Sequence, residues 1–452
     1  MTKKGGRNDR GMTICTQIVK IAILYEPMVK QSRFSLRKFF RALGPGFITG
    51  ASDDDPAGIA TYAQTGAQFG YSQVWLAVLT TPFMIVVQEM CGRIGMVKGR
   101  GLASVIGARY GRRALTVVVV ILVAVNAVNI GADLGAMASS MQLLFGLPFA
   151  MRLFLMTAII LTLQIFVSYK TYAKYLKYLT LSLFTYVVAA FVAHVDWSAV
   201  WQATRFPRIQ LTRDYLFNIV AVLGTTITPY LFFWQASEEV EEEVAAGKLS
   251  AMDTGTPRVT ANDIGRMRFD TVVGMVFSNA IMFFIIVTAA VTLHARGITN
   301  IETAAQAAEA LRPLDGGMST WLFALGIIGT GLLAVPVLAG SASYAVAELL
   351  GWRSGLYQKF KDAHGFYGII TIATVIGIGV NFTAIPPFKM LYYSAVLGGM
   401  LAPPLMIIIM RIASDPKTMG KHTNSFAMNV LGWIITIVMS LCAVGLLLQF
   451  LF

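Results

Sequence analysis

The chain contains 452 residues, of which 56% are hydrophobic and 13% are charged, and its mean hydropathy is +0.66. Soluble globular domains carry about 25% charged residues, so this composition excludes most soluble proteins. Cys15, Cys91 and Cys442 are widely spaced and indicate neither a disulfide framework nor a zinc site. Because the apolar residues form long runs, the composition predicts an all-α polytopic membrane protein.

The chain begins with a polar and basic tail. Its first 36 residues contain no apolar core followed by a small-residue cleavage site, so we expect a cytosolic tail over residues 1–41 rather than a signal peptide. A membrane-spanning helix needs roughly 20 mostly apolar residues. Eleven segments approach this length: 42–68, 73–97, 115–142, 150–168, 175–195, 214–236, 271–293, 321–348, 366–382, 388–412 and 427–450.

Lysine and arginine lie mostly on one side of these segments. With a cytosolic N-terminus, the tail and the cytosolic loops hold 28 of the 36 basic residues, and the opposite side holds seven. Cytosolic loops of membrane proteins are enriched in basic residues. We therefore expect a multi-pass protein of the inner membrane with a cytosolic N-terminus and an extracytosolic C-terminus. We therefore attribute the net charge of +13 to the topology of a protein whose partner is the lipid bilayer. We do not expect it to bind nucleic acid.

The first and sixth segments are each interrupted at their centre. Asp55 directly precedes Pro56 in the first, and Thr228 directly precedes Pro229 in the sixth. Proline has no backbone N–H, and the residue before it is disfavoured in helical conformation. Both helices should therefore unwind at these points. Unwound backbone at membrane depth is tolerated only where it is buried or lines an aqueous cavity.

The two interruptions also divide the chain into similar halves. Each interrupted helix is the first of five, which is typical of an inverted repeat with a substrate site near the bilayer midplane. We predict a transport core over 42–412, with halves 42–195 and 214–412, and an additional helix over 427–450. A simple kink at each proline is the alternative, but the matched positions and three adjacent aspartates favour a site.

The residues at the interruptions predict a cation site made of oxygen ligands. Asp55 is the best carboxylate ligand, joined by the Thr228 hydroxyl or carbonyl, the Thr225 carbonyl, and backbone or water near Gly58. No methionine or histidine occurs in either interrupted segment. Oxygen ligands suit Mg²⁺, Mn²⁺ and Ca²⁺, whereas sulfur or imidazole would favour later transition metals.

Several other ionisable residues belong to the same expectation. Asp53 and Asp54 cannot face the same point as Asp55 on a helix and are expected to line the approach, to cap the second half-helix or to be protonated. Asp133 is expected to be part of the pathway, since no basic residue lies on its segment. Glu89 either forms a structural i,i+4 ion pair with Arg93 or belongs to a second cation site.

At these residues the chain is similar to a known family. The stretch GPGFITGASDDDPAGIATY resembles the first helix of the Nramp divalent-metal transporters, whose break reads Asp-Pro-Gly-Asn. VQEMCGRIGMVKGRGLASVI resembles their second helix and the following loop, and LGTTITPY falls where they have Ala-x-x-Met-Pro-His. The resemblance implies a leucine-transporter-like 5+5 inverted repeat with about eleven transmembrane helices.

The chain also departs from the family pattern. Asp55 matches the family's metal-binding aspartate. Gly58 replaces its asparagine ligand, Thr228 replaces its methionine ligand, and Tyr230 replaces its proton-handling histidine. Asp133 matches an aspartate of the third helix, whereas Ala136 replaces a glutamate of the proton pathway. This pattern resembles the Nramp-related magnesium transporters, which implies import of Mg²⁺ or Mn²⁺ with weak or no proton coupling.

Three alternatives remain beside this interpretation. One is a proton-coupled Mn²⁺ or Fe²⁺ symporter of the same family. Another is an amino-acid or amine transporter of the same fold, although such sites hold a substrate carboxylate, which the acidic run would repel. The third is an intramembrane aspartic protease using Asp55 and Asp133. We predict a transporter rather than an enzyme, with the metal ion as substrate and no cofactor.

A run of five glutamates lies between Glu238 and Glu243, after the sixth segment. Such a run could collect cations at a cytosolic mouth. A charge run at a helix end is more often a solvated face, and this is the interpretation we favour from the sequence.

Overall fold

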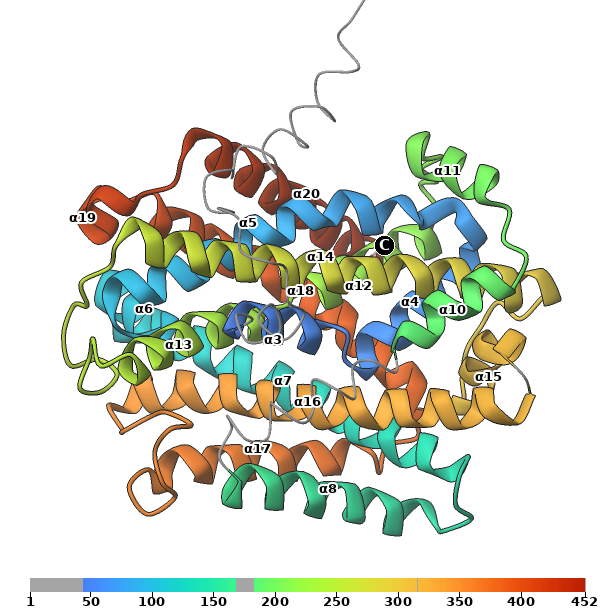
Figure 1. Ribbon diagram of the computed structural model, residues 1–452, viewed down its shortest axis with the longest axis horizontal. Helices are drawn as coiled ribbons and strands as arrows, with labels where there is room; N and C mark the ends of the chain where they lie inside the picture. The colour runs from blue at the N-terminus through green and yellow to red at the C-terminus, as the bar shows by residue number, and fades with distance from the viewer. Residues whose placement is uncertain (1–43, 168–182, 315, 452) are drawn as a thin grey trace, which may run out of the picture. The chain divides into compact units, whose positions relative to one another are not determined.

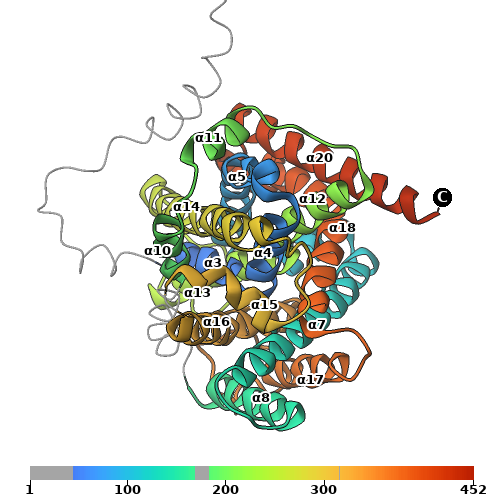
Figure 2. The same cartoon turned by 90° about the vertical axis from the view of Figure 1, so that its right-hand side faces the viewer.

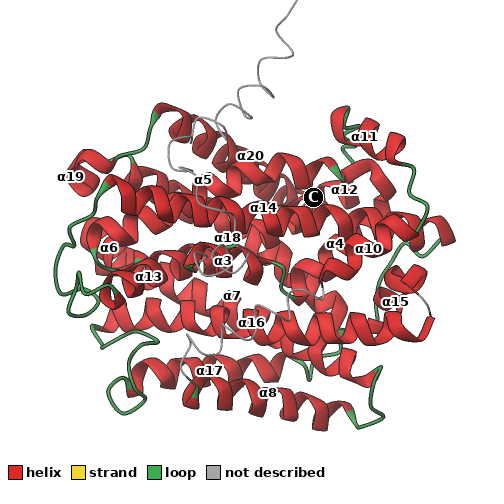
Figure 3. Cartoon of the chain, in the orientation of Figure 1, coloured by secondary structure: helices red, strands yellow, loops and turns green. Residues whose placement is uncertain are grey.

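The computed structural model describes residues 44–167, 183–314 and 316–451. The predicted tail over 1–41 and parts of the fourth and fifth predicted segments lie outside these ranges. Figures 1 and 3 show helices joined by loops throughout the described part of the chain. The predicted all-α architecture is therefore observed.

Each of the eleven predicted segments contains at least one helix. In the first half these are α3 (Pro45–Asp53), α4 (Pro56–Phe69), α5 (Trp75–Lys98), α7 (Arg112–Gln142), α8 (Phe149–Phe166) and α10 (Phe184–Val192). In the second half they are α12 (Arg213–Thr226), α13 (Pro229–Ala245), α14 (Ala261–Thr292), α16 (Gly316–Leu350), α17 (His364–Val380) and α18 (Pro387–Ala413), followed by α20 (Phe426–Leu451).

Not all of these helices are long enough to cross a membrane individually. Among the described residues, eight helical segments have the required length and apolarity, with α12 and α13 together counted as one. The 17-residue helix α17 is shorter, α3 and α4 are two short halves, and the described part of the fifth segment is α10.

Short helices mark the two ends of the helical bundle. The helices α6 (Leu102–Tyr110) and α19 (Pro416–Met419) lie at one end, and α11 (Trp197–Arg205) and α15 (Ala304–Ala308) lie at the other (Figure 1). We name these ends the α6 end and the α15 end. Figure 2 looks onto the α15 end, where α4, α12, α15 and α18 face the viewer.

The two halves of the first interrupted helix pack against α14. Helix α14 packs along both α3 and α4, while α7 packs mainly with α16 and α17. Asp270 of α14 accepts hydrogen bonds from the Gly44 and Gly46 amides at 2.9 and 2.7 Å and so binds the free amides at the beginning of α3. A Cβ atom on Gly50 would lie 2.3 Å from the Gly274 carbonyl oxygen, so the two backbones are in direct contact.

This contact predicts a large difference between two glycine substitutions. Gly50→Ala should lower the apparent melting temperature in detergent, because overpacking against rigid backbone costs about 1–3 kcal/mol or more. Gly368→Ala on α17 is the matched control, since its Cβ would meet no atom within 4 Å and alanine favours helix. Equal melting temperatures for the two variants would contradict this packing.

Candidate functional site

Both predicted interruptions are present. Helix α3 ends at Asp53 and α4 begins at Pro56, with Asp55 in extended conformation (φ −69°, ψ 172°). Helix α12 ends at Thr226 and α13 begins at Pro229, with Thr228 extended (φ −95°, ψ 138°). Each proline therefore occupies the first position of a half-helix, where its missing N–H is tolerated.

The prolines also leave one carbonyl group free in each break. In a continuous helix, the amide of residue 56 would donate to the Ser52 carbonyl and that of residue 229 to the Thr225 carbonyl, but proline has no N–H to donate. The Tyr230 hydroxyl donates to the Ser52 carbonyl oxygen at 3.1 Å. This bond joins the two breaks directly, and the Thr225 carbonyl is left available to a ligand.

Asp55 lies at the centre of this arrangement. Its side chain is 3% exposed and caps α4 by accepting the Gly58 amide at 2.6 Å, where the helix N-terminus favours negative charge. The Tyr230 hydroxyl lies 3.3 Å from the other carboxylate oxygen. A Cβ on Gly58 would lie 2.9 Å from the Asp53 carbonyl oxygen, so this position requires glycine. Gly58 thus supplies an amide to Asp55.

The other two aspartates of the triplet face a different helix. The Ser278 hydroxyl of α14 lies 2.9 Å from Asp53 Oδ2 and 3.2 Å from Asp54 Oδ1. Both side chains are fully buried, and Asp53 Oδ1 and Asp54 Oδ2 have no hydrogen-bond partner within the described part of the chain. The expectation that the three aspartates diverge is confirmed. Sequence reasoning missed Ser278, which is one of several polar residues on an otherwise apolar segment.

Asp133 approaches the first break from α7. It is fully buried, lies close enough to Asp55 to interact electrostatically with it, and faces the Ala57 amide. Among the residues that the structure describes, neither of its carboxylate oxygens has a hydrogen-bond partner of good geometry. Asp55 and Asp133 therefore form a pair of buried carboxylates contributed by two separate helices, as the interpretation of Asp133 as a pathway residue requires.

The two threonines predicted as ligands lie in the second break but do not contact Asp55 through a hydrogen bond within the described residues. Thr225 and Thr228 are buried, but no recorded hydrogen bond among the described residues joins either to Asp55. Thr226, which we did not single out, contacts the first interrupted helix instead, with its hydroxyl 3.3 Å from that of Tyr62. Within the described ranges, no three His, Cys, Asp or Glu side chains are arranged to hold a metal ion. A bound ion would therefore depend on backbone carbonyls, hydroxyls or water as well as carboxylates.

A cavity of about 710 Å³ leads from the α15 end toward the site. It is lined by residues of α4, α12, α18 and the loop before α15, among them Ala60, Gln64, Phe217, Asn300 and Tyr392. Ala60 lies five residues beyond Asp55, which corresponds to roughly 7–8 Å along a helix. The cavity therefore ends about two turns or less from the aspartate cap of α4.

Comparisons with known proteins identify the family. The family model "Natural resistance-associated macrophage protein-like" (Nramp) matches residues 46–449. The chain belongs to the Nramp family. The divalent metal cation transporter MntH of Mycobacterium tuberculosis is 24% identical over 425 residues, covering 93% of this chain and 94% of that protein. MntH of Mesorhizobium japonicum is 24% identical over 421 residues, covering 90% and 88%.

Solved structures agree on the fold. A variant of the Eremococcus coleocola manganese transporter matches with a TM-score of 0.70 at 16% identity, covering 92% of this chain and 87% of that chain. A transporter of the nucleobase-cation-symport-1 family matches with a TM-score of 0.58 at 12% identity, covering 90% of both chains. The predicted leucine-transporter-like fold is therefore confirmed. The Nramp relatives are transporters rather than enzymes, so the protease alternative is rejected.

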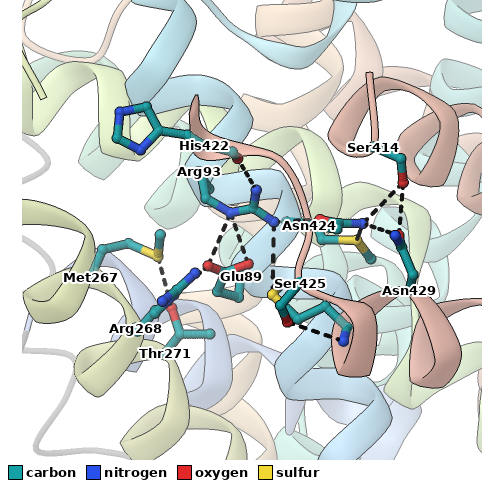
Figure 4. A network of polar contacts seen from close by, with 12 residues as sticks. Glu89, Arg93, Met267, Arg268, Thr271, Ser414, His422, Asn424, Ser425 and Asn429 are labelled. Atoms are coloured by element: carbon teal, nitrogen blue, oxygen red, sulfur yellow. Dashed lines mark hydrogen bonds and ion pairs between the residues drawn. The ribbon is translucent and has the colours of Figure 1, made fainter. Parts of the chain in front are cut away.

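A second polar network lies near the α6 end of this Nramp protein (Figure 4). Arg93 donates to Glu89 at 3.0 and 3.2 Å, and Arg268 of α14 donates to the same carboxylate at 2.5 Å. Arg93 also donates to the His422 carbonyl and to the Asn424 side chain, which lie just before α20. The network supports the structural interpretation of Glu89 and holds α20 against α5.

The network predicts a strong dependence of stability on Arg93. Arg93→Ala should lower the stability of the folded protein by about 3–5 kcal/mol, because it removes a partner of a buried ion. Arg296→Ala, in the exposed pair with Glu309, is the control and should cost about 0–1 kcal/mol. Melting curves in detergent measure both, and a small Arg93 effect would show that Arg268 alone is sufficient for Glu89.

Proposed function

We propose that this Nramp protein imports hard divalent cations, Mg²⁺ or Mn²⁺, through the site between the two breaks. The observation that carries the proposal is the pair Asp55 and Asp133, two buried carboxylates with no basic side chain among their recorded partners. Burying uncompensated charge is costly, and a divalent cation neutralises two carboxylates. The names of the relatives, divalent metal cation transporter and manganese transporter, support the same substrate class.

The chemistry of the ligands favours a hard ion. Asp55, Asp133, the Thr225 carbonyl and the Thr228 hydroxyl or carbonyl offer oxygen only, and Gly58 adds no side-chain ligand. Mg²⁺ binds oxygen and retains part of its water shell. A later transition metal would gain from sulfur or imidazole, which both breaks lack. The run Asp53, Asp54 and Asp55 offers no basic group to an anionic substrate such as an amino acid.

We propose that proton coupling is weak or absent. Tyr230 stands where the family pattern has a histidine, and its hydroxyl is already engaged with Ser52 and Asp55. Ala136 on α7 replaces the glutamate of the family's proton pathway and cannot carry a proton. The alternative, a proton-coupled symporter of Mn²⁺ or Fe²⁺, predicts acidification of the proteoliposome lumen during metal uptake, which a trapped pH indicator detects.

The direction of import follows from the charge distribution. The loops at the α6 end belong to the basic side of the chain, so we assign this end to the cytosol of the inner membrane and the C-terminus to the opposite side. The cavity at the α15 end is then open to the extracytosolic side. Alternating access would carry the ion from this cavity to the α6 end.

The carboxylate pair makes a direct prediction for transport. Asp55→Ala should abolish Mg²⁺ and Mn²⁺ flux into proteoliposomes, and Asp133→Asn should reduce it at least about tenfold, because each variant loses half of the compensating charge. Glu242→Gln changes an exposed carboxylate and should leave the flux unchanged. Retained flux in Asp55→Ala would refute the site.

A second prediction concerns ion selectivity. Thr228→Met introduces the sulfur ligand of the family pattern and should improve Cd²⁺ uptake relative to Mg²⁺, because soft ions prefer thioether. The measurement is a competition assay with both ions in proteoliposomes. Thr228→Val, which has similar size and no sulfur, is the control. Identical selectivity in the methionine variant and the parent would remove Thr228 from the ligand set.

A further inference from the structure

The glutamate run at the end of α13 is not a solvated face. Glu238, Glu239, Glu241 and Glu243 are buried, and only Glu242 of the five is exposed. The sequence-based interpretation of this run was therefore wrong. Buried carboxylates need hydrogen-bond donors, and the identity of those donors indicates what this segment does.

Glu241 binds groups of α16 and of the loop that follows it. It accepts hydrogen bonds from the Tyr344 hydroxyl of α16 and from the Leu356 amide at 2.5 Å, in the loop between α16 and α17. Tyr344 is fully buried, and its ring packs against Trp234 of α13 and Phe366 of α17 with centroid distances of 6.2 and 4.9 Å. The inner half of the second broken helix is thus attached to α16 and α17.

A second carboxylate makes a similar connection at the same end. Glu348 of α16 accepts the Ser104 amide at 2.7 Å in the first turn of α6, where free amides and the helix dipole favour an anion. A Cβ on Gly101 would clash with Glu348 Oε1, so glycine at this position leaves space for the carboxylate. Because α6 directly follows α5, this bond connects the α5 side of the protein to α16.

The two connections lie at the end opposite the cavity. At the α15 end, the 710 Å³ cavity is lined by α4 and α12 on one side and by α18 on the other. At the α6 end, α13 and α6 are both hydrogen-bonded to α16, through the carboxylates of Glu241 and Glu348. The same broken helix therefore has one half beside an open cavity and the other half fastened.

We propose that Glu241 and Glu348, with their partners Tyr344, Leu356 and Ser104, form a latch that holds the α6 end closed. Opening of the site toward the α6 end requires the latch to separate, since α13 cannot leave α16 while Glu241 holds Tyr344 and Leu356. The glutamates are therefore gating residues and do not collect cations. This inference rests on the proposed function only in assuming that the site opens alternately to the two ends.

The latch can be tested by labelling of single cysteines in intact cells and inside-out vesicles. In a background with Cys15, Cys91 and Cys442 replaced by alanine, Ala60→Cys reports on the cavity and Ser237→Cys on α13, where the parent serine is buried. A membrane-impermeant maleimide is applied to cells for the first reporter and to vesicles for the second. Glu241→Ala and Tyr344→Phe should lower Ala60→Cys labelling several-fold and raise Ser237→Cys labelling by a similar factor.

The controls separate latch release from loss of fold. Glu242→Ala, on the same helix turn but exposed, should leave both labelling rates unchanged, and Gly101→Ala should act like Glu241→Ala by displacing Glu348. Unchanged labelling at both reporters in Glu241→Ala and Tyr344→Phe would overturn the latch, and so would increased labelling at both, which indicates unfolding. Labelling requires no metal, so the result is independent of whether the protein transports Mg²⁺ or Mn²⁺.

Discussion

The centre of this protein depends on two proline residues that lack a backbone N–H. Pro56 and Pro229 each begin a half-helix and deprive a carbonyl group one turn earlier, that of Ser52 or Thr225, of its helical donor. In a lipid environment such a carbonyl persists only where protein, water or an ion satisfies it. The Tyr230 hydroxyl satisfies Ser52 from across the second break. The two interruptions are therefore tolerated because each lies against the other.

The same breaks determine what the carboxylates can do. Asp55 caps a half-helix and lies within electrostatic range of Asp133, whereas Asp53 and Asp54 turn to Ser278 on α14. None of the four has a basic partner among its recorded contacts, in contrast to Glu89, which binds two arginines. A buried carboxylate bound to arginine is already neutralised, whereas a bound divalent cation can neutralise Asp55 and Asp133. This difference separates the proposed transport site from a structural ion pair.

Carboxylates at the α6 end illustrate a third environment. Glu241 accepts hydrogen bonds from a phenol and a backbone amide, and Glu348 accepts one from a backbone amide. Such hydrogen bonds are strong when made and require little rearrangement to exchange for water, which suits contacts that separate during a transport cycle. In the proposed alternating-access cycle, the fastened α6 end and the cavity at the α15 end correspond to one state.

The sequence by itself determined the helical segments and the two interruptions, because apolar length and the X-Pro dipeptide act locally along the chain. It also located Asp55, Asp133 and the family resemblance. It did not reveal Ser278, Tyr62 or Thr226, nor the burial of Glu238, Glu239, Glu241 and Glu243, and it left Glu89 undecided. Those outcomes depend on which helices pack together. Distant segments supply the donors of a carboxylate, and these donors decide whether it is solvated, ion-paired or hydrogen-bonded. Tertiary structure alone decided these partners, because residues such as Glu241 and Tyr344 are separated by about a hundred positions in the chain and meet only after folding.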